Sequence, residues 1–260
     1  MEGRGSAYRL DPAPLGRTPA EWGWVSTRDL REGGVEPISA ASAAVGDSRT
    51  LESLRRLTDS PASQRRARAD TLLSLVEALR VKDAYTARHS ARVATVSHHL
   101  AVRLNCSDPE IERIRIAAVL HDVGKIGIPD AILTKPGRLT KEEFDHMKRH
   151  PVMGVDILEP IGFLRPVLAL VRHHHEWVDG TGYPDGLRGE AIPFGASVIQ
   201  AADSIDAMMS PRSYKRGYDI AEVIAELEQG AGTQFHPCVA EAAVGWLEQN
   251  PSMIQSSIQS

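Results

Sequence analysis

The stretch Ala117–Gly127 carries an adjacent histidine and aspartate, His121 and Asp122, with Lys125 three residues further on. The apolar residues 111–120 predict a helix whose end is buried. A buried charge requires a partner, and a metal ion would provide one, because imidazole nitrogen and carboxylate oxygen are both metal ligands. Lys125 would add a point charge suited to a phosphate oxygen. A salt-bridged core pair is the alternative that this stretch alone leaves open.

Other possible ligands lie at predicted helix ends or interrupt apolar helices. Three consecutive histidines, His173 to His175, follow an apolar run and would make an unusual solvent-exposed face. Asp203 interrupts a buried-looking helix, where a carboxylate requires a cation. Taken singly, the histidines have a surface residue as the alternative, and Asp203 has pairing with an arginine. The separated candidates are His89, His121 with Asp122, His150, His174 with His175, and Asp203.

The elements that must position these residues are all predicted to be helices. No segment shows the alternation of a strand, so the expected fold is all-α with functional loops between the helices. We expect Asp108 to cap the helix that leads to His121, and capping boxes at Thr140 and Asp219. The expected helices run from Pro61 through Leu79 and over 86–104, 108–120, 140–150, 164–175, 194–209 and 220–227, with a last one after Pro237.

Composition narrows the class of protein. The 260 residues suffice for one large domain or one domain plus an extension. A net charge of −4 and a pI near 6.2 argue against a DNA-binding protein. Two cysteines, Cys106 and Cys238, make no disulfide framework. Residues 1–30 show no apolar core of a signal peptide, and no run approaches a membrane span, so we expect a cytoplasmic protein.

Residues 1–60 differ from the rest of the chain. They are rich in Gly, Pro, Ser and Ala, and Trp22 and Trp24 are their only bulky anchors. Such a composition buries little apolar area, so we expect a mostly irregular N-terminal arm, with a sensory or docking segment as the alternative. The expected organisation is an arm over 1–60, a domain over 61–250 and a tail over 251–260.

Several segments resemble the HD phosphohydrolase superfamily and, within it, the HD-GYP subfamily. His121-Asp122 followed by Gly124-Lys125 resembles the superfamily. The run His174-His175-Glu176, followed by the glycine-rich residues 179–187, narrows the resemblance to the subfamily. Further matching segments, in the same order, are 89–93, 135–140 and 232–235. The resemblance covers about residues 70–240 and does not extend to residues 1–60.

The resemblance implies an HD-domain helical bundle with extended loops and a di-metal centre, usually of iron or manganese. It also implies hydrolysis of cyclic di-GMP to pGpG, GMP or both. Asp122 would bridge the two ions and act with Lys125 in catalysis, Lys125 contacting the scissile phosphate. The implied metal ligands are His89, His121, Asp122, His150, His174, His175 and Asp203. The implied substrate-binding residues are Lys125, Arg212, Lys215, Gly182, Tyr183 and Pro184.

The implied chemistry suits these residue types. Two metal ions a few ångströms apart can hold a bridging hydroxide and clamp phosphate oxygens, and mixed imidazole and carboxylate ligation favours iron or manganese. Some positions depart from the subfamily pattern, which affects substrate positioning more than metal binding. They are Trp177, Val178, Pro211, Ser213, His236 and Cys238.

Two other functions stay open at this point. One is an HD hydrolase that acts on another cyclic dinucleotide or nucleotide. A protein of a different class would sense cyclic di-GMP without hydrolysing it, or dock a GGDEF-type diguanylate cyclase through the loop Gly182-Tyr183-Pro184. A complete ligand set argues against such a binding module, because an inactive module is free to lose ligands.

Overall fold

The computed structural model describes residues 61–210 and 217–251. The chain divides into two units, Met1–Ser74 and Leu75–Ser260. The arm predicted over residues 1–60 lies outside the described residues, as does the predicted tail except for Pro251. The predicted domain boundaries therefore stay predictions.

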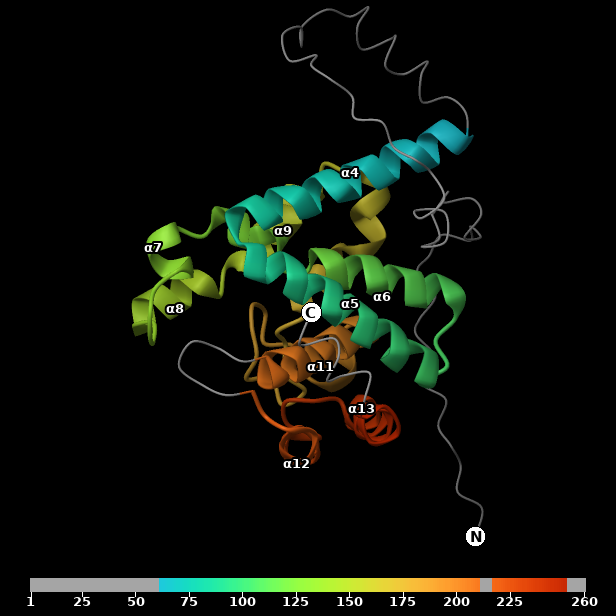
Figure 1. The fold of residues 1–260 in the computed structure, drawn as a ribbon, viewed down its shortest axis with the longest axis vertical. Coiled ribbons are helices and arrows are strands. Elements are labelled where there is room, and N and C mark those ends of the chain that lie inside the picture. The colour runs from blue at the N-terminus through green and yellow to red at the C-terminus, as the bar shows by residue number, and fades with distance from the viewer. Residues whose placement is uncertain (1–60, 211–216, 252–260) are drawn as a thin grey trace, which may run out of the picture. The chain divides into compact units, whose positions relative to one another are not determined.

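The described residues form helices and no named strand, which confirms the all-α fold (Figure 1). None of these helices is both long and apolar enough to cross a membrane. The elements in chain order are α4 (Pro61–Lys82), α5 (Ala84–Arg103), α6 (Asp108–Leu120), η1 (Val123–Gly127), α7 (Asp130–Leu133), α8 (Lys141–Met147), α9 (His150–Leu158), η2 (Gly162–Val167), α10 (Leu168–His173), η3 (Gly189–Ala191), α11 (Phe194–Met209), α12 (Ile220–Gly230) and α13 (Pro237–Gln249), where η marks a 3₁₀ helix.

Helices α5 and α6 form a hairpin, and α11 packs against both of them (Figure 1). These three helices enclose the core that lies next to the predicted ligand residues. Five apolar side chains of this core are at most 1% exposed: Val93 and Leu100 of α5, Ile114 and Ala117 of α6, and Ile199 of α11. Burying a side chain of the size of leucine contributes about 1.5–3 kcal/mol. The three helices therefore form a well-packed base for the polar residues that they carry.

Side-chain caps fix where several helices begin. The two predicted capping boxes are confirmed: Glu143 accepts from the backbone N–H of Thr140 at 2.7 Å, and Glu222 from that of Asp219 at 2.8 Å. The predicted cap at Asp108 is wrong. Ser107 caps α6, because Glu110 lies three residues after Ser107 and accepts its N–H at 2.7 Å.

Two predicted helices differ from the observed ones next to prolines. The helix predicted to end at His150 ends at Met147, and His150 instead begins α9. Pro151 is tolerated there because the first turn of a helix does not need its N–H groups for intrahelical bonds. The helix predicted over 164–175 is a 3₁₀ helix around Pro166 followed by the short α10.

Gly124 permits a close approach between η1 and α9. A Cβ atom added at this position would lie 1.9 Å from the carbonyl oxygen of His150 and 2.5 Å from the backbone nitrogen of Gly154. Such distances are far inside van der Waals contact, so a larger residue would push α9 away. The glycine therefore fixes the position from which His150 projects.

We expect Gly124→Ala to lower the free energy of unfolding by roughly 1–3 kcal/mol, the usual cost of overpacking a tight contact. Urea unfolding followed by circular dichroism measures the change. Gly162→Ala is the matched control, because its added Cβ would meet no atom within 4 Å. Equal stability of the two variants would contradict this account of the η1–α9 contact.

Candidate metal centre

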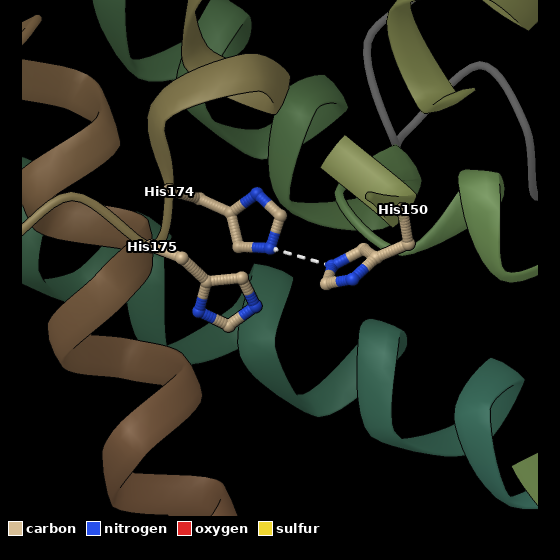
Figure 2. Close-up of side chains that lie close together, drawn as sticks. All are labelled: His150, His174 and His175. Carbon is tan, nitrogen blue, oxygen red and sulfur yellow. Dashed lines mark hydrogen bonds between the residues drawn. The ribbon is translucent and has the colours of Figure 1, made fainter. Parts of the chain in front are cut away.

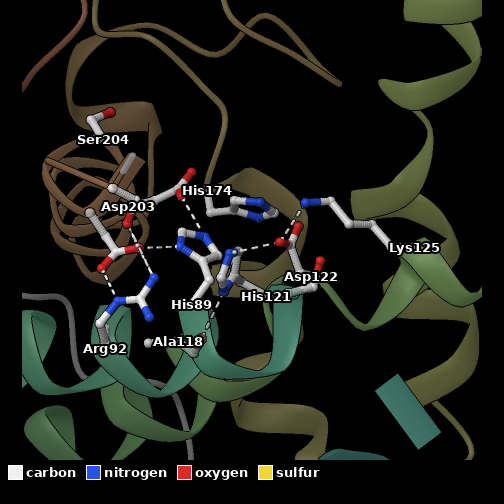
Figure 3. A network of polar contacts seen from close by, with 12 residues as sticks. His89, Arg92, Ala118, His121, Asp122, Lys125, His174, Asp203 and Ser204 are labelled. Carbon is white, nitrogen blue, oxygen red and sulfur yellow. Dashed lines mark hydrogen bonds and ion pairs between the residues drawn. The ribbon is translucent and has the colours of Figure 1, made fainter. Parts of the chain in front are cut away.

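The structure brings all seven predicted ligand side chains together (Figures 2 and 3). They come from α5, the end of α6, the start of α9, the end of α10 and the middle of α11. Within each of two groups, the candidate ligand atoms lie within 4.8 Å of one another. One group is His89, His121 and Asp203, and the other is His150, His174 and His175.

Asp122 lies between the two groups and is 1% exposed. Its Oδ2 atom is 3.3 Å from Nε2 of His121, in the first group. Its Oδ1 atom is 3.3 Å from Nε2 of His150, in the second group. One carboxylate thus directs one oxygen toward each group, which is the arrangement that a bridging ligand requires.

Two buried atoms at this place fit a bound cation. Nε2 of His121 and Oδ1 of Asp122 are buried, and neither has a hydrogen-bond partner in the part of the chain that the structure describes. A buried polar atom without a partner costs about 1–3 kcal/mol. Both atoms are ordinary metal ligands, so a cation between the two groups would satisfy them.

Three of the histidines are oriented by helix ends. The last carbonyl groups of a helix lack intrahelical partners, and each of these imidazoles donates its Nδ1–H to the carbonyl three residues earlier. In a neutral imidazole this bond makes Nε2 the unprotonated nitrogen and directs it into the site, as metal-ligating histidines require. The pairs are His121 with Ala118 at 2.7 Å, His150 with Met147 at 2.9 Å and His174 with Val171 at 2.7 Å.

His89 is held differently, by carboxylates at both ring nitrogens. Its Nε2 lies 2.9 Å from Asp203 and its Nδ1 2.6 Å from Asp206. Burial by itself would lower the pKa of His89, but hydrogen bonds to the two carboxylates raise this pKa to about 10. Asp206 is a second acid in the apolar sequence of α11, and its partnership with His89 was not predicted.

Burial sets the charge states of the second group. It lowers the pKa of His150 to about 3, that of His175 to about 4, and that of His174 well below its ordinary value. The three imidazoles are therefore neutral at pH 7, which is the form that binds a metal. Burial would raise the pKa of Asp122, but Lys125 and the neighbouring imidazoles hold it well below its usual range.

Lys125 lies at the edge of the site. Its Nζ atom is 2.6 Å from Oδ2 of Asp122, and its side chain is 22% exposed. Burial by itself would lower the pKa of Lys125, but Asp122 raises it, so the ammonium stays charged. Arg212 and Lys215, the other basic residues predicted near the substrate, lie outside the described residues.

The loop Gly182-Tyr183-Pro184 folds back onto His175. The Tyr183 ring stacks on the His175 ring with a centroid separation of 4.7 Å, and the Tyr183 N–H donates to the His175 carbonyl at 3.1 Å. A Cβ atom at Gly182 would lie 2.2 Å from the backbone nitrogen of Trp177, so this contact requires glycine. These residues therefore support a ring of the site directly.

Glu176 anchors the same loop and was not predicted to have a role. Glu176 is 2% exposed. A glutamate directly after three histidines was the available sequence signal, but its partners lie nine to eleven residues away. It accepts three backbone N–H groups, those of Asp185 at 2.7 Å, Gly186 at 3.1 Å and Leu187 at 3.0 Å.

We expect the metal-depleted protein to lose stability as the pH falls from about 6.5 to about 5. Histidines in the unfolded chain take up protons near pH 6.5, whereas buried His150, His174 and His175 stay neutral. The unfolded state then binds more protons, so the free energy of unfolding decreases by up to about 1.4 kcal/mol per pH unit for each histidine. Urea unfolding across this range measures the slope.

His89 does not contribute in this window, because its raised pKa keeps it protonated in both states below about pH 6.5. The control is His150→Gln, which removes one of the three neutral imidazoles. A pH slope as steep in this variant as in the original chain would contradict the prediction.

Comparison with known proteins places this chain in a family. Residues 74–239 match the family model described as HD domain. The chain is 38% identical to the cyclic di-GMP phosphodiesterase response regulator RpfG of Xanthomonas campestris, over 75% of this chain and 52% of that protein. It is 42% identical to a cyclic di-GMP phosphodiesterase of Thermotoga maritima, over 66% of this chain and 49% of that protein. The chain thus spans about half the length of these relatives.

A solved structure shares the fold. It is a cyclic GMP-AMP-specific phosphodiesterase of Vibrio cholerae, V-cGAP3, with a TM-score of 0.54 and 20% identity. The match covers 73% of this chain and 50% of that one. The family model, the relatives and the shared helical fold agree with the resemblance found in the sequence, and the chain belongs to the HD domain family.

Proposed function

We propose that this chain hydrolyses the phosphodiester bonds of cyclic di-GMP, to pGpG, GMP or both, with the help of two divalent transition metal ions. The observation that carries the proposal is the position of Asp122, with one oxygen toward each group of histidines. His89, His121 and Asp203 would hold one ion, and the other would be held by His150, His174 and His175. Asp122 would belong to both sites.

The donor set favours iron or manganese. Five imidazoles and two carboxylates, without a thiolate, form a ligand set that suits these metals. When bound, such ions supply positive charge to the phosphate oxygens and lower the pKa of water so that it can attack at neutral pH. Nε2 of His121 and Oδ1 of Asp122, which are buried and have no hydrogen-bond partner among the described residues, support this assignment.

The protein's own residues would bind and orient the phosphate. Lys125 is charged and partly exposed beside Asp122, so its ammonium group would stabilise negative charge that develops on the phosphate during the reaction. The stacking of Tyr183 on His175 and the three bonds to Glu176 would keep the adjacent loop in place at the site. Arg212 and Lys215 stay predicted substrate contacts.

The names of the two relatives favour cyclic di-GMP as the substrate. Lys125 and the proposed ions act on phosphate, which every cyclic dinucleotide carries, so an assay should compare cyclic di-GMP with 3′,3′-cyclic GMP-AMP. Docking of a GGDEF-type diguanylate cyclase through the loop Gly182-Tyr183-Pro184, and a cytoplasmic location, stay predictions.

We expect the purified chain, prepared without chelator, to contain about two iron or manganese ions and to release pGpG or GMP from cyclic di-GMP. Elemental analysis counts the ions, and chromatography identifies the product. Removal of the metal should abolish turnover, and added Mn²⁺ should restore it. A metal-free protein that hydrolyses cyclic di-GMP would refute the proposed mechanism. A metal-loaded protein that binds cyclic di-GMP without hydrolysing it would indicate a sensor.

We expect Lys125→Ala to lower kcat by about 10²–10³, the usual effect of removing one group that stabilises developing charge.

His121→Ala and Asp122→Ala should abolish hydrolysis and leave the helical circular dichroism spectrum largely intact, because both residues serve the metal centre. Lys148→Ala is the matched control, since Lys148 pairs at the surface with Asp145. Near-normal turnover in the His121 or Asp122 variant would refute the assignment.

A further inference from the structure

His89 is held at both ring nitrogens by carboxylates of one helix. Asp203 and Asp206 lie three residues apart on α11, so they project from the same face of that helix. The oxygen of Asp203 lies 2.9 Å from Nε2 of the His89 ring, and that of Asp206 lies 2.6 Å from Nδ1. Asp203 belongs to the group of candidate ligands, whereas Asp206 contacts Nδ1, the other nitrogen of the His89 ring.

The location of His89 explains why it needs a carboxylate from another helix. His89 is the sixth residue of α5, well before the end of that helix at Arg103. Inside a helix, the carbonyl three residues earlier already accepts a backbone N–H. The carbonyl three residues before His89 is therefore already used, unlike the carbonyls that accept from His121, His150 and His174. The Asp206 carboxylate accepts the Nδ1–H of His89 instead.

Asp206 is itself held in a fixed orientation. The guanidinium of Arg92 donates to both of its oxygens, from Nε at 2.6 Å and from Nη2 at 2.9 Å. The Ser210 hydroxyl lies 3.3 Å from Oδ2. With 5% of its surface exposed, Asp206 is buried among these partners. A carboxylate held by a two-pronged arginine contact has little freedom to rotate away from His89.

We propose that Asp206 is a positioning residue that sets the affinity of one of the two metal positions, the one formed by His89, His121 and Asp203. This inference rests on the proposed two-metal centre. A carboxylate behind a ligating histidine fixes the ring and makes its other nitrogen a stronger ligand. His150 and His174 take their Nδ1 partners from backbone carbonyls, so loss of Asp206 should leave the second metal position unchanged.

A simple structural role for Asp206 predicts a different result. The pair of Arg92 and Asp206 also joins α5 to α11, and a contact that only stabilises the fold would affect both metal positions or neither. A count of the metal positions that are weakened therefore distinguishes a positioning role of Asp206 from a packing role. This count does not require a measurement of hydrolysis.

The test is titration of the metal-depleted full chain with Mn²⁺ by isothermal titration calorimetry. For the original chain we expect two binding events. For Asp206→Ala we expect one event to weaken by about 10–100-fold while the other keeps its dissociation constant. Asp206→Asn, which keeps an acceptor oxygen of the same size, should give an intermediate loss, and it carries the test if the alanine variant does not fold.

Glu77→Gln is the matched control. Glu77 makes the same two-pronged contact, since Arg80 donates to it from Nε at 2.8 Å and from Nη2 at 2.5 Å, but neither residue belongs to any group of candidate metal ligands. The titration of this variant should match that of the original chain. Unchanged events in both Asp206 variants, or equal weakening of both events, would overturn the inference. Failure of the original chain to bind Mn²⁺ would overturn the proposed metal centre itself, which no Asp206 result can do.

Discussion

The burial of the Asp122 carboxylate is the constraint around which the site is built. A charged group removed from water must be surrounded by opposite charge and by donors, or it destabilises the fold. Here Lys125 provides the opposite charge on one side, and on two others the imidazoles of His121 and His150 face the carboxylate with nitrogens that can share a cation with it. The same requirement explains why the polar residues converge from separate helices on one point, and why a cation completes their arrangement.

Tight backbone packing keeps this arrangement in register. Gly124 lets α9 approach η1 closely enough to bring His150 toward Asp122, and Gly182 lets its loop fold against the end of α10. Neither glycine is needed for an unusual backbone angle, since the left-handed glycines lie at other positions. In both places the absence of a side chain, and not chain flexibility, is the property that the structure uses.

The sequence predicted local features well. Helix α11 has the bounds that its apolar pattern predicted, and the two capping boxes form as expected because each depends on residues three apart. Prolines were harder to interpret. The sequence predicts a helix that ends at His150, directly before Pro151, whereas Pro151 stands in the first turn of a helix, because the same residue type suits both positions.

The ligand residues were predicted partly from their types and partly from resemblance, whereas their supporting partners were not predicted. Histidines after apolar runs and an acid within an apolar helix can be recognised in a single sequence. The pairing of Asp206 with His89 joins residues 117 positions apart, and no local pattern indicates such a contact. The bonds from Glu176 to the loop likewise depend on how the loop folds, which the sequence pattern does not specify.

The Nδ1 contacts of the histidines also differ in how they can be acquired as the chain folds. His121, His150 and His174 each bond a carbonyl three residues away, so their rings can be oriented as soon as a single helix end has formed. The ring of His89 gains its partner only when α5 meets α11, a loop closure over more than a hundred residues. Three ligands of the centre can thus be oriented by local structure, whereas the orientation of His89 depends on the completed tertiary fold.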